Sequence, residues 1–135
     1  MGMLRKNTAA LLAAVALATG GAITTATPAS AAQTCPADNL CLYSSTGFND
    51  MKMRTVQTSV CFALSTFQLI GDRHIMSYDN NLSVKAVLWH TRSLDQSWIS
   101  DGAISAGGFS SNTGGNFNDA VVVCTGGRSP YWPGI

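Results

Sequence analysis

The chain has 135 residues, of which 46% are hydrophobic and only 11% are charged, with eight basic and seven acidic side chains and a formal net charge of +1. Such a near-neutral chain lacks the basic footprint that nucleic acid or an anionic membrane surface requires, so we expect neither as a partner. Every acidic residue is Asp, which favours turns, and none is Glu, which favours helices. This bias indicates β structure with many loops.

The N-terminus has the three parts of a secretory signal peptide. Arg5 and Lys6 form a short basic region, residues 11–18 are an apolar run too short to cross a bilayer, and small residues lead up to Ala31. We predict residues 1–31 as the signal peptide, with Ala32 as the second choice for its last residue, and therefore a secreted, extracellular protein. The remaining segment keeps six basic and seven acidic residues, a net charge of −1.

The predicted elements of the mature segment are nearly all strands. In chain order they cover residues 40–43, 52–56, 60–64, 84–89, 103–105 and 120–124, with turn residues between them, and this spacing predicts a sandwich. A single helical turn is expected within residues 65–70. Residues 105–118 are rich in Gly, Ser and Asn and are expected to form a loop. We predict one domain over residues 32–127 and an irregular tail over residues 128–135.

One pattern occurs twice in the mature segment. Each copy opens with an aromatic residue followed five positions later by a second large apolar residue, and each ends with a pair of Asx residues next to a β-rich segment. The opening pairs are Tyr43/Phe48 and Trp89/Leu94, and the closing pairs are Asp79-Asn80 and Asn118-Asp119. Units of this length are the size of a four-stranded Greek key, so we predict an all-β fold of two such motifs.

The four cysteines all lie in the mature segment, at Cys35, Cys41, Cys61 and Cys124. An even number of cysteines in an exported chain implies two disulfides, and the sequence allows three pairings. We favour Cys35–Cys41, a local clip across a turn-forming stretch, with Cys61–Cys124, which would tie the first repeat to the last strand. A metal site is the alternative, but no C-x2-C pair is present and the two histidines stand alone.

The repeated openings are similar to the hairpin signature of βγ-crystallin Greek keys, and the Asx pairs look like their second signature. With the Cys-Pro-x-x-x-Leu-Cys-Leu-Tyr opening of residues 35–43, they resemble the bacterial peptidase inhibitor family typified by the Streptomyces metalloproteinase inhibitor. This resemblance, which covers nearly all of residues 35–124, implies a disulfide-stapled, βγ-crystallin-like sandwich. It also implies inhibition of thermolysin-type zinc proteases.

The chain departs from these patterns at several positions. Asp50 and Gln96 stand where the crystallin signature has glycine, and Leu94 replaces the second aromatic residue. No cysteine lies between Cys61 and Cys124, whereas the resemblance implies an inhibitory loop that is braced by a second close cysteine pair.

Residues 79–83, Asp-Asn-Asn-Leu-Ser, match the calcium pattern of βγ-crystallins, except that Val84 follows where Ser is expected. Carboxylate, amide and hydroxyl oxygens in a tight turn suit a hard cation. In the second copy, however, Val122 stands where a hydroxyl ligand is needed. The alternative is an Asx-rich turn stabilised by its own side-chain hydrogen bonds. We expect no metal site and no cofactor.

No catalytic constellation is recognisable in the sequence. His74 and His90 accompany no zinc-protease motif, no nucleophile elbow and no cysteine outside the predicted disulfides. The seven Asp residues are scattered, and nothing marks two of them as a glycosidase pair. We therefore expect a protein that is not an enzyme.

The leading prediction is a monomeric inhibitor of an extracellular zinc metalloprotease that binds through a rigid, substrate-like loop. The candidate contact loops are residues 105–116 and 66–74, in which Phe109, next to the flexible Gly108, or Ile70 could fill a hydrophobic protease subsite. The aromatic tail residues Tyr131 and Trp132 are the next candidates. The alternative function is a non-inhibitory crystallin-like binding module for calcium, carbohydrate or a cell-envelope partner.

Overall fold

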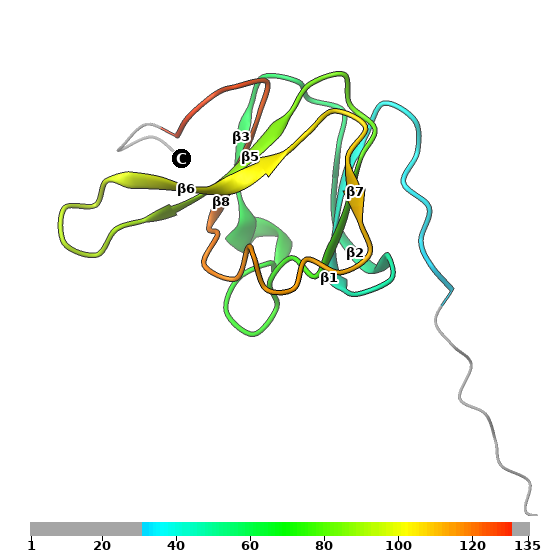
Figure 1. Cartoon of the computed structure of the whole chain (residues 1–135), viewed down its shortest axis with the longest axis horizontal. Coiled ribbons are helices and arrows are strands. Elements are labelled where there is room, and N and C mark those ends of the chain that lie inside the picture. Colours follow the sequence, from blue (N-terminus) through cyan, green and yellow to red (C-terminus); the bar gives the residue numbers. More distant parts are fainter. Residues whose placement is uncertain (1–30, 131–135) are drawn as a thin grey trace, which may run out of the picture.

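The computed structural model describes residues 31–130, which form two four-stranded antiparallel sheets and one short helix (Figure 1). The strands are β1 (Leu40–Ser45), β2 (Asn49–Thr55), β3 (Cys61–Ala63), β4 (Ser77–Asn80), β5 (Ala86–Thr91), β6 (Trp98–Ile104), β7 (Phe109–Ser110) and β8 (Val122–Thr125), and the 3-10 helix η1 (Leu64–Phe67) joins β3 to β4. All of the predicted signal peptide except its last residue, and the tail aromatics Tyr131 and Trp132, lie outside the described residues. No helix of the described segment is long and apolar enough to cross a membrane.

The two sheets are built on one plan. The strand order is β2-β1-β4-β7 in the first sheet and β3-β8-β5-β6 in the second. If the chain is divided after β4, each sheet contains the second, first and fourth strands of one half, and the third strand of the other half completes it. The two halves therefore exchange their third strands, and neither sheet is complete without both halves.

The core lies between the sheets, and strand alternation explains which side chains enter it. In β1, Leu40 and Leu42 point inward, and in β5 Ala86 and Leu88 occupy the equivalent positions. Successive side chains of a strand point to opposite faces, and the other face of β1 is also buried, in a second cluster outside the first sheet. All four residues are fully buried, and replacing Leu42 by Ala would cost about 2–5 kcal/mol because it leaves a cavity.

The first and last hairpins carry a β-bulge at the same point. In the β1–β2 pair the register shifts between Leu42 and Tyr43, so that Lys52 has no partner in the ladder. In the β5–β6 pair the register shifts between Leu88 and Trp89, and Asp101 is the extra residue. A bulge bends its strand and re-aims the neighbouring side chains. The repeat seen in the sequence is therefore also a repeat of backbone geometry.

Both disulfides have the predicted pairing. Cys35–Cys41 joins the segment before β1 to β1 itself, across six positions of the chain. Cys61–Cys124 joins β3 to β8, where the two residues are direct partners in the second sheet, and it spans 63 positions. The second bridge therefore fixes the strand that the first half contributes to the second sheet.

Each of the six predicted strands overlaps a strand of the structure, and the predicted helical turn is η1. Two strands were not predicted. Residues 77–80, interpreted as part of an Asx turn, form β4, and the predicted loop 105–118 is interrupted by β7. Asp, Asn and Gly have low strand propensity, but pairing with β1 on one side and β7 on the other overrides it.

The two Asx pairs are not equivalent, which corrects the way the repeat was aligned. Asp79-Asn80 ends β4, whereas Asn118-Asp119 lies in a turn before β8. Only the hairpin openings, Tyr43 with Phe48 and Trp89 with Leu94, occupy matching places in the two halves.

Candidate functional site

Phe109 is the first residue of β7 and not part of a loop. It pairs with Asp79 of β4, and its side chain is 70% exposed on the outer face of the first sheet. The preceding turn is fixed by Asn80, because the Asn80 N–H donates to the Gly108 carbonyl at 2.9 Å and the Gly107 N–H donates to the Asn80 carbonyl at 2.8 Å. The backbone of Phe109 is thus fixed by hydrogen bonds to β4, but its side chain lies on the face of a sheet and does not protrude.

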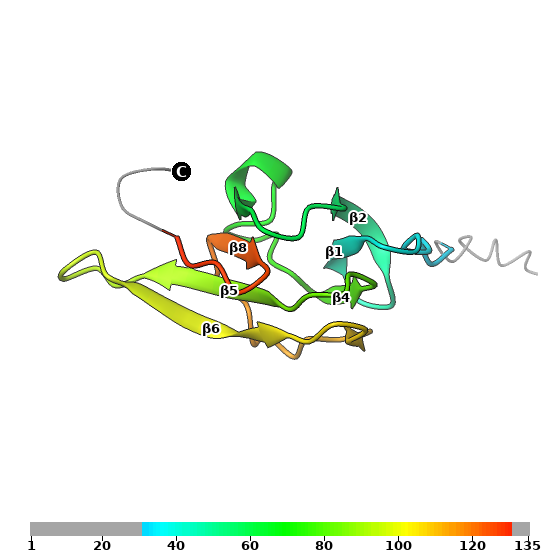
Figure 2. The same cartoon turned by 90° about the horizontal axis from the view of Figure 1, so that it is seen from above.

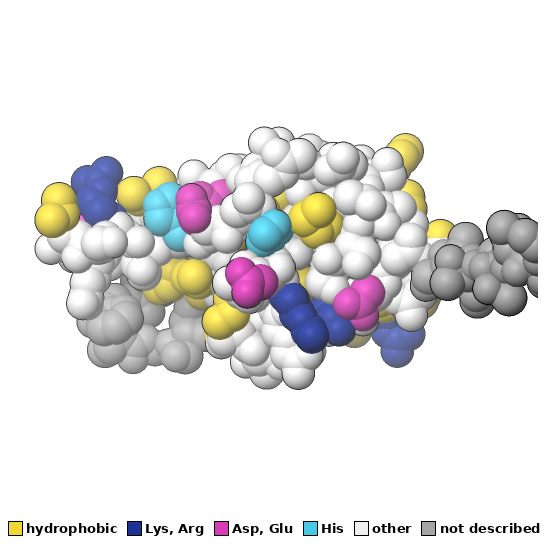
Figure 3. Space-filling model, turned by 90° about the horizontal axis from the view of Figure 1, so that it is seen from below, with side chains coloured by type: hydrophobic (Ala, Val, Ile, Leu, Met, Phe, Trp, Pro, Cys, Tyr) yellow, Lys and Arg dark blue, Asp and Glu magenta, His cyan; other side chains and the backbone are white. Residues whose placement is uncertain are grey.

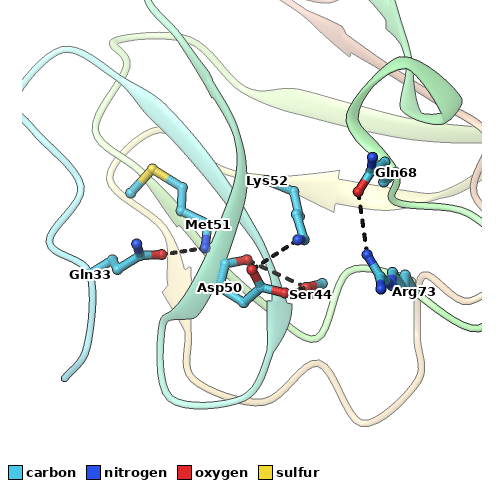
Figure 4. Close-up of polar contacts among 7 residues, drawn as sticks. All are labelled: Gln33, Ser44, Asp50, Met51, Lys52, Gln68 and Arg73. Carbon is cyan, nitrogen blue, oxygen red and sulfur yellow. Dashed lines mark hydrogen bonds and ion pairs between the residues drawn. The ribbon is translucent and has the colours of Figure 1, made fainter. Parts of the chain in front are cut away.

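Ile70 is 43% exposed and lies in the turn between η1 and β4. Within this turn, the Arg73 side chain donates a hydrogen bond to the Gln68 side chain at 3.3 Å (Figure 4). The pKa of Asp50, in the β1–β2 hairpin, is lowered mainly by the hydrogen bond from Ser44, and the charge of Arg73 adds to this effect. The Arg73 charge acts across a partly exposed surface. Residues 70–73 of the turn are all exposed.

The two predicted contact loops meet at one end of the sandwich. The Thr113 N–H donates to the Met76 carbonyl at 2.9 Å, and the Thr113 hydroxyl donates to the Ile75 carbonyl at 2.8 Å. The Gly47 N–H of the β1–β2 turn donates to the Ser111 carbonyl at 2.7 Å. These bonds tie residues 111 and 113 of the first loop to the β1–β2 turn and to the segment that directly follows the second loop.

The β5–β6 hairpin extends well beyond the two sheets (Figures 1 and 2). The ladder between β5 and β8 ends at the pair Trp89 and Val122, so from His90 onward β5 is bonded to β6 alone. At the tip of the hairpin, Leu94 is 93% exposed, the largest exposed fraction among the large hydrophobic residues of the described segment. A single apolar side chain is therefore presented at the end of a two-stranded finger.

The tip of this finger, residues 92–97, is ordered by its own hydrogen bonds. The backbone N–H of Arg92 donates to the Ser97 carbonyl, and that of Gln96 donates to the Arg92 carbonyl, both at 2.9 Å. The Asp95 carboxylate accepts hydrogen bonds from the hydroxyl of Ser97 at 2.7 Å and from its N–H at 3.1 Å. These two bonds, the hydroxyl first, lower the pKa of Asp95, so the carboxylate remains an acceptor in mildly acidic solution.

At the base of the finger, a side-chain pair joins its two strands. His90 Nδ1 lies 2.5 Å from Asp101 Oδ1, and the Asp101 side chain is only 10% exposed. Asp101 is the extra residue of the bulge, so the bulge is what brings its carboxylate to His90. The pair braces the finger where its support by β8 ends.

Leu94 was not among the predicted contact residues, although the sequence contains a signal for it. It is the counterpart of Phe48 in the repeat, and it stands in a run of otherwise polar residues, Arg-Ser-Leu-Asp-Gln-Ser. Phe48 folds back onto Tyr43, with the ring centroids 5.7 Å apart in an edge-on arrangement. The Leu94 side chain makes no comparable return to its sheet.

The side chains of the candidate calcium motif point in different directions. Asp79 faces the outside of the first sheet, whereas Asn80 is fully buried and donates to the carbonyls of Val84 and Ser105 at 3.0 and 2.9 Å. Asn80 Oδ1 accepts a hydrogen bond from the Leu82 N–H at 3.2 Å, which is the Asx turn given as the alternative. No group of three or more His, Cys, Asp or Glu side chains suited to a metal is found among residues 31–130.

The two histidines lie apart, and the charged side chains do not gather by sign. Figure 3 shows two separate histidine patches, with acidic and basic groups interspersed on the same face. His74 Nδ1 lies 3.1 Å from the Gly71 carbonyl, within its own turn, while His90 belongs to the hairpin. The two rings do not form a common site.

Comparison with protein-family models, with curated proteins and with solved structures finds no match to this chain. The function proposed below is therefore based on the geometry of the finger and on the motif resemblance.

Proposed function

We propose that this protein is a secreted inhibitor of an extracellular protease, and that the tip of the β5–β6 hairpin enters the active-site cleft of its target. The observation that carries this proposal is the exposed Leu94 on a protruding, internally hydrogen-bonded tip. Proteases bind extended, convex segments, and loops held by a rigid β scaffold are well suited to that role.

Order in the tip is what would distinguish an inhibitor from a substrate. A flexible loop pays about 0.5–1.5 kcal/mol for each side chain that it immobilises on binding, and a pre-ordered loop avoids much of this cost. In this hairpin the Asp95–Ser97 bonds and the Arg92–Ser97 closure replace the cysteine brace that the resemblance implies. The backbone bonds of Arg92 with Ser97 and Gln96 also hold the two chain ends together if a bond next to Leu94 is cut, which favours its resynthesis.

The apolar tip residue indicates the type of subsite. Leu94 would fill a hydrophobic pocket, whereas the neighbouring Arg92 and Asp95 lie 3.9 Å apart and partly neutralise each other. With the motif resemblance, this favours a thermolysin-type zinc metalloprotease as the target. The two disulfides are consistent with an extracellular protein, in keeping with the predicted signal peptide.

We also propose that the fold is a βγ-crystallin-like pair of Greek keys. Three features support this: the exchange of third strands between the two halves, the matching bulges in the two hairpins, and the backbone at the signature glycine positions. Asp50 and Gln96 both have a φ of 55°, in the left-handed region that glycine occupies most readily. The conformation required at these positions is thus retained although the glycine is not.

The test is a titration of the purified protein, starting at Ala32, against thermolysin, with subtilisin and trypsin in parallel. We expect tight, stoichiometric inhibition of thermolysin. Leu94→Ala should weaken it about thirtyfold, because filling a pocket with a Leu side chain is worth about 2 kcal/mol.

Phe109→Ala and Ile70→Ala are the matched controls, since both remove an exposed apolar side chain elsewhere. Each should inhibit as well as the parent. Full inhibition by Leu94→Ala together with loss in either control would move the contact to a predicted loop. Absence of inhibition of all three proteases would reject the function and favour the non-inhibitory binding module.

A further inference from the structure

The outer face of the first sheet is crossed by residues 32–36, which we call the N-terminal strap. The Gln33 N–H donates to the Phe48 carbonyl at 2.7 Å, the Tyr43 hydroxyl donates to the Gln33 carbonyl at 2.8 Å, and the Gln33 side chain accepts from the Met51 N–H (Figure 4). The Asn81 side chain donates to the carbonyls of the strap at its other end. With the Cys35–Cys41 disulfide, these bonds fix the strap in place.

Between the strap and β7 lies a surface hollow of about 440 Å³, within the range of small-ligand sites. Three aromatic residues, Tyr43, Phe48 and Phe109, line it together with Asp79 and Asn81. Tyr43 and Phe48 come from the β1–β2 hairpin and Phe109 from β7, so the two sides of the hollow belong to different halves of the chain. Phe109, at 70% exposed, has a face available to a ligand.

Asp79 gives the hollow an uncompensated negative charge. Burial raises the pKa of Asp79, and only the Asn81 side chain opposes this effect. Its charge in turn adds to the effect of burial in raising the pKa of Tyr43, which lines the same hollow. Within residues 31–130, no Lys, Arg or His forms an ion pair with Asp79.

We propose that this hollow binds an organic ammonium group, with Asp79 supplying the opposite charge and Phe48 and Phe109 contacting the methyl or methylene groups beside the nitrogen. A carboxylate among aromatic faces is selective for such a cation, because the ring faces attract positive charge while they exclude water. An inorganic divalent cation would instead need several oxygen ligands, and the neighbouring Asn80 side chain is turned into the core.

Two ammonium groups have access to the site. One is the α-ammonium of Ala32, a residue that lines the hollow and that becomes the N-terminus if the signal peptide is cut after Ala31. The other is an external amine, such as a lysine side chain or a quaternary ammonium compound. The chemistry is the same, and the inference is independent of protease inhibition.

The experiment follows the Asp79 carboxyl and Phe109 ring signals by NMR while tetramethylammonium chloride is added to the protein starting at Ala32, with its α-amine free or acetylated. Sodium chloride and calcium chloride at equal ionic strength are the reference salts. We expect saturable shifts with tetramethylammonium, weakened about fivefold or more in Asp79→Asn and in Phe109→Ala. Asp119→Asn, which removes an exposed carboxylate in a turn, is the matched control and should bind as the parent.

The two sources of the ammonium give different results. If the α-ammonium of Ala32 occupies the hollow, acetylation raises the Asp79 pKa and tightens tetramethylammonium binding. If an external amine is the ligand, acetylation changes neither. The proposal is overturned if neither form shows saturable shifts and acetylation leaves Asp79 unchanged, or if calcium chloride produces the same shifts as tetramethylammonium.

Discussion

The β1–β2 and β5–β6 hairpins share one backbone plan but have opposite surroundings. Both carry a bulge next to an aromatic residue, and both have a left-handed residue near the tip. The tip of the first, at Phe48, is folded onto Tyr43 and tied to the strap and to residue 111. The second has a longer loop, extends beyond β8 and leaves Leu94 exposed. One hairpin therefore stabilises the first sheet, and the other leaves an apolar side chain exposed at its tip.

Removing the disulfides should have the largest effect on the free energy of unfolding. Replacing Cys61 and Cys124 together by Ala should lower the free energy of unfolding by roughly 4 kcal/mol, and replacing Cys35 and Cys41 by roughly 2 kcal/mol, because the longer bridge restricts the unfolded chain more. Urea denaturation of both double variants measures this. The reverse order would mean that the strap stabilises the domain more than the exchanged strand does.

Replacing Phe48 and Leu94 by Ala tests whether the first hairpin tip is packed and the second is not. Phe48→Ala should cost about 2–3 kcal/mol of stability, since it removes an aromatic side chain packed on Tyr43, whereas Leu94→Ala should change stability by less than about 0.5 kcal/mol. Thermal unfolding gives both values, and the inhibition assay should show the opposite ranking. Equal losses of stability would show that the β5–β6 tip is also packed.

The left-handed residues sharpen the comparison further. Gln96→Gly should stabilise the domain by about 1 kcal/mol, because it removes the cost of about 1–2 kcal/mol that a non-glycine residue pays in this conformation, and the greater flexibility of glycine in the unfolded chain offsets only part of this gain. Asp50→Gly should be close to neutral, because it also loses the Ser44 hydrogen bond and the Lys52 ion pair at 2.9 Å. The denaturation midpoints of the two variants measure these effects. If Gln96→Gly does not stabilise the domain, the left-handed conformation at this position costs little free energy.

The smallest effects concern two carboxylates at the first hairpin. The hydrogen bond from Ser44 lowers the pKa of Asp50, so its stabilising contribution is present above the unfolded-state pKa of about 3.9 and is lost as the pH falls through the folded value. Burial raises the pKa of Asp79, so its contribution is destabilising above that higher value and disappears at low pH.

We therefore expect Asp79→Asn to stabilise the protein at pH 7 and Asp50→Asn to destabilise it, each by less than about 1 kcal/mol because both groups are partly exposed. Both differences should vanish near pH 2. Melting temperatures of the two variants across this pH range provide the measurement, and a stabilising effect of Asp79→Asn that persists at pH 2 would contradict the assignment.

The part of the fold that could be predicted is the part with local signals. Short runs of apolar residues marked β1 and β5, and the turn-forming stretch between Cys35 and Cys41 marked the local disulfide. β4 and β7 were missed because their Ser, Asp and Asn residues carry no strand signal, and only pairing across the chain makes them strands.

Long-range strand pairing also explains why the positions of the candidate site residues in the fold could not be predicted from the sequence. Phe109 was chosen for its flexible glycine neighbours, but pairing with β4 holds it on a sheet, where it lines the hollow. Leu94 protrudes because the pairing of β5 with β8 stops at Trp89. The residues around Leu94 give no information about where this pairing ends. Protrusion depends on where the neighbouring strand ends, and that strand lies about thirty residues further along the chain.

The exchange of β3 and β7 between the sheets has a consequence for the history and engineering of the domain. A chain consisting of one half alone would have an unfilled sheet edge and a spare third strand, and a second copy related by a twofold axis could satisfy both. The domain is thus equivalent to a strand-swapped dimer whose two subunits have been joined into one polypeptide. Cutting the connection between β4 and β5 should accordingly leave two fragments joined by the Cys61–Cys124 disulfide, and after its reduction the exchanged strands should still hold them together.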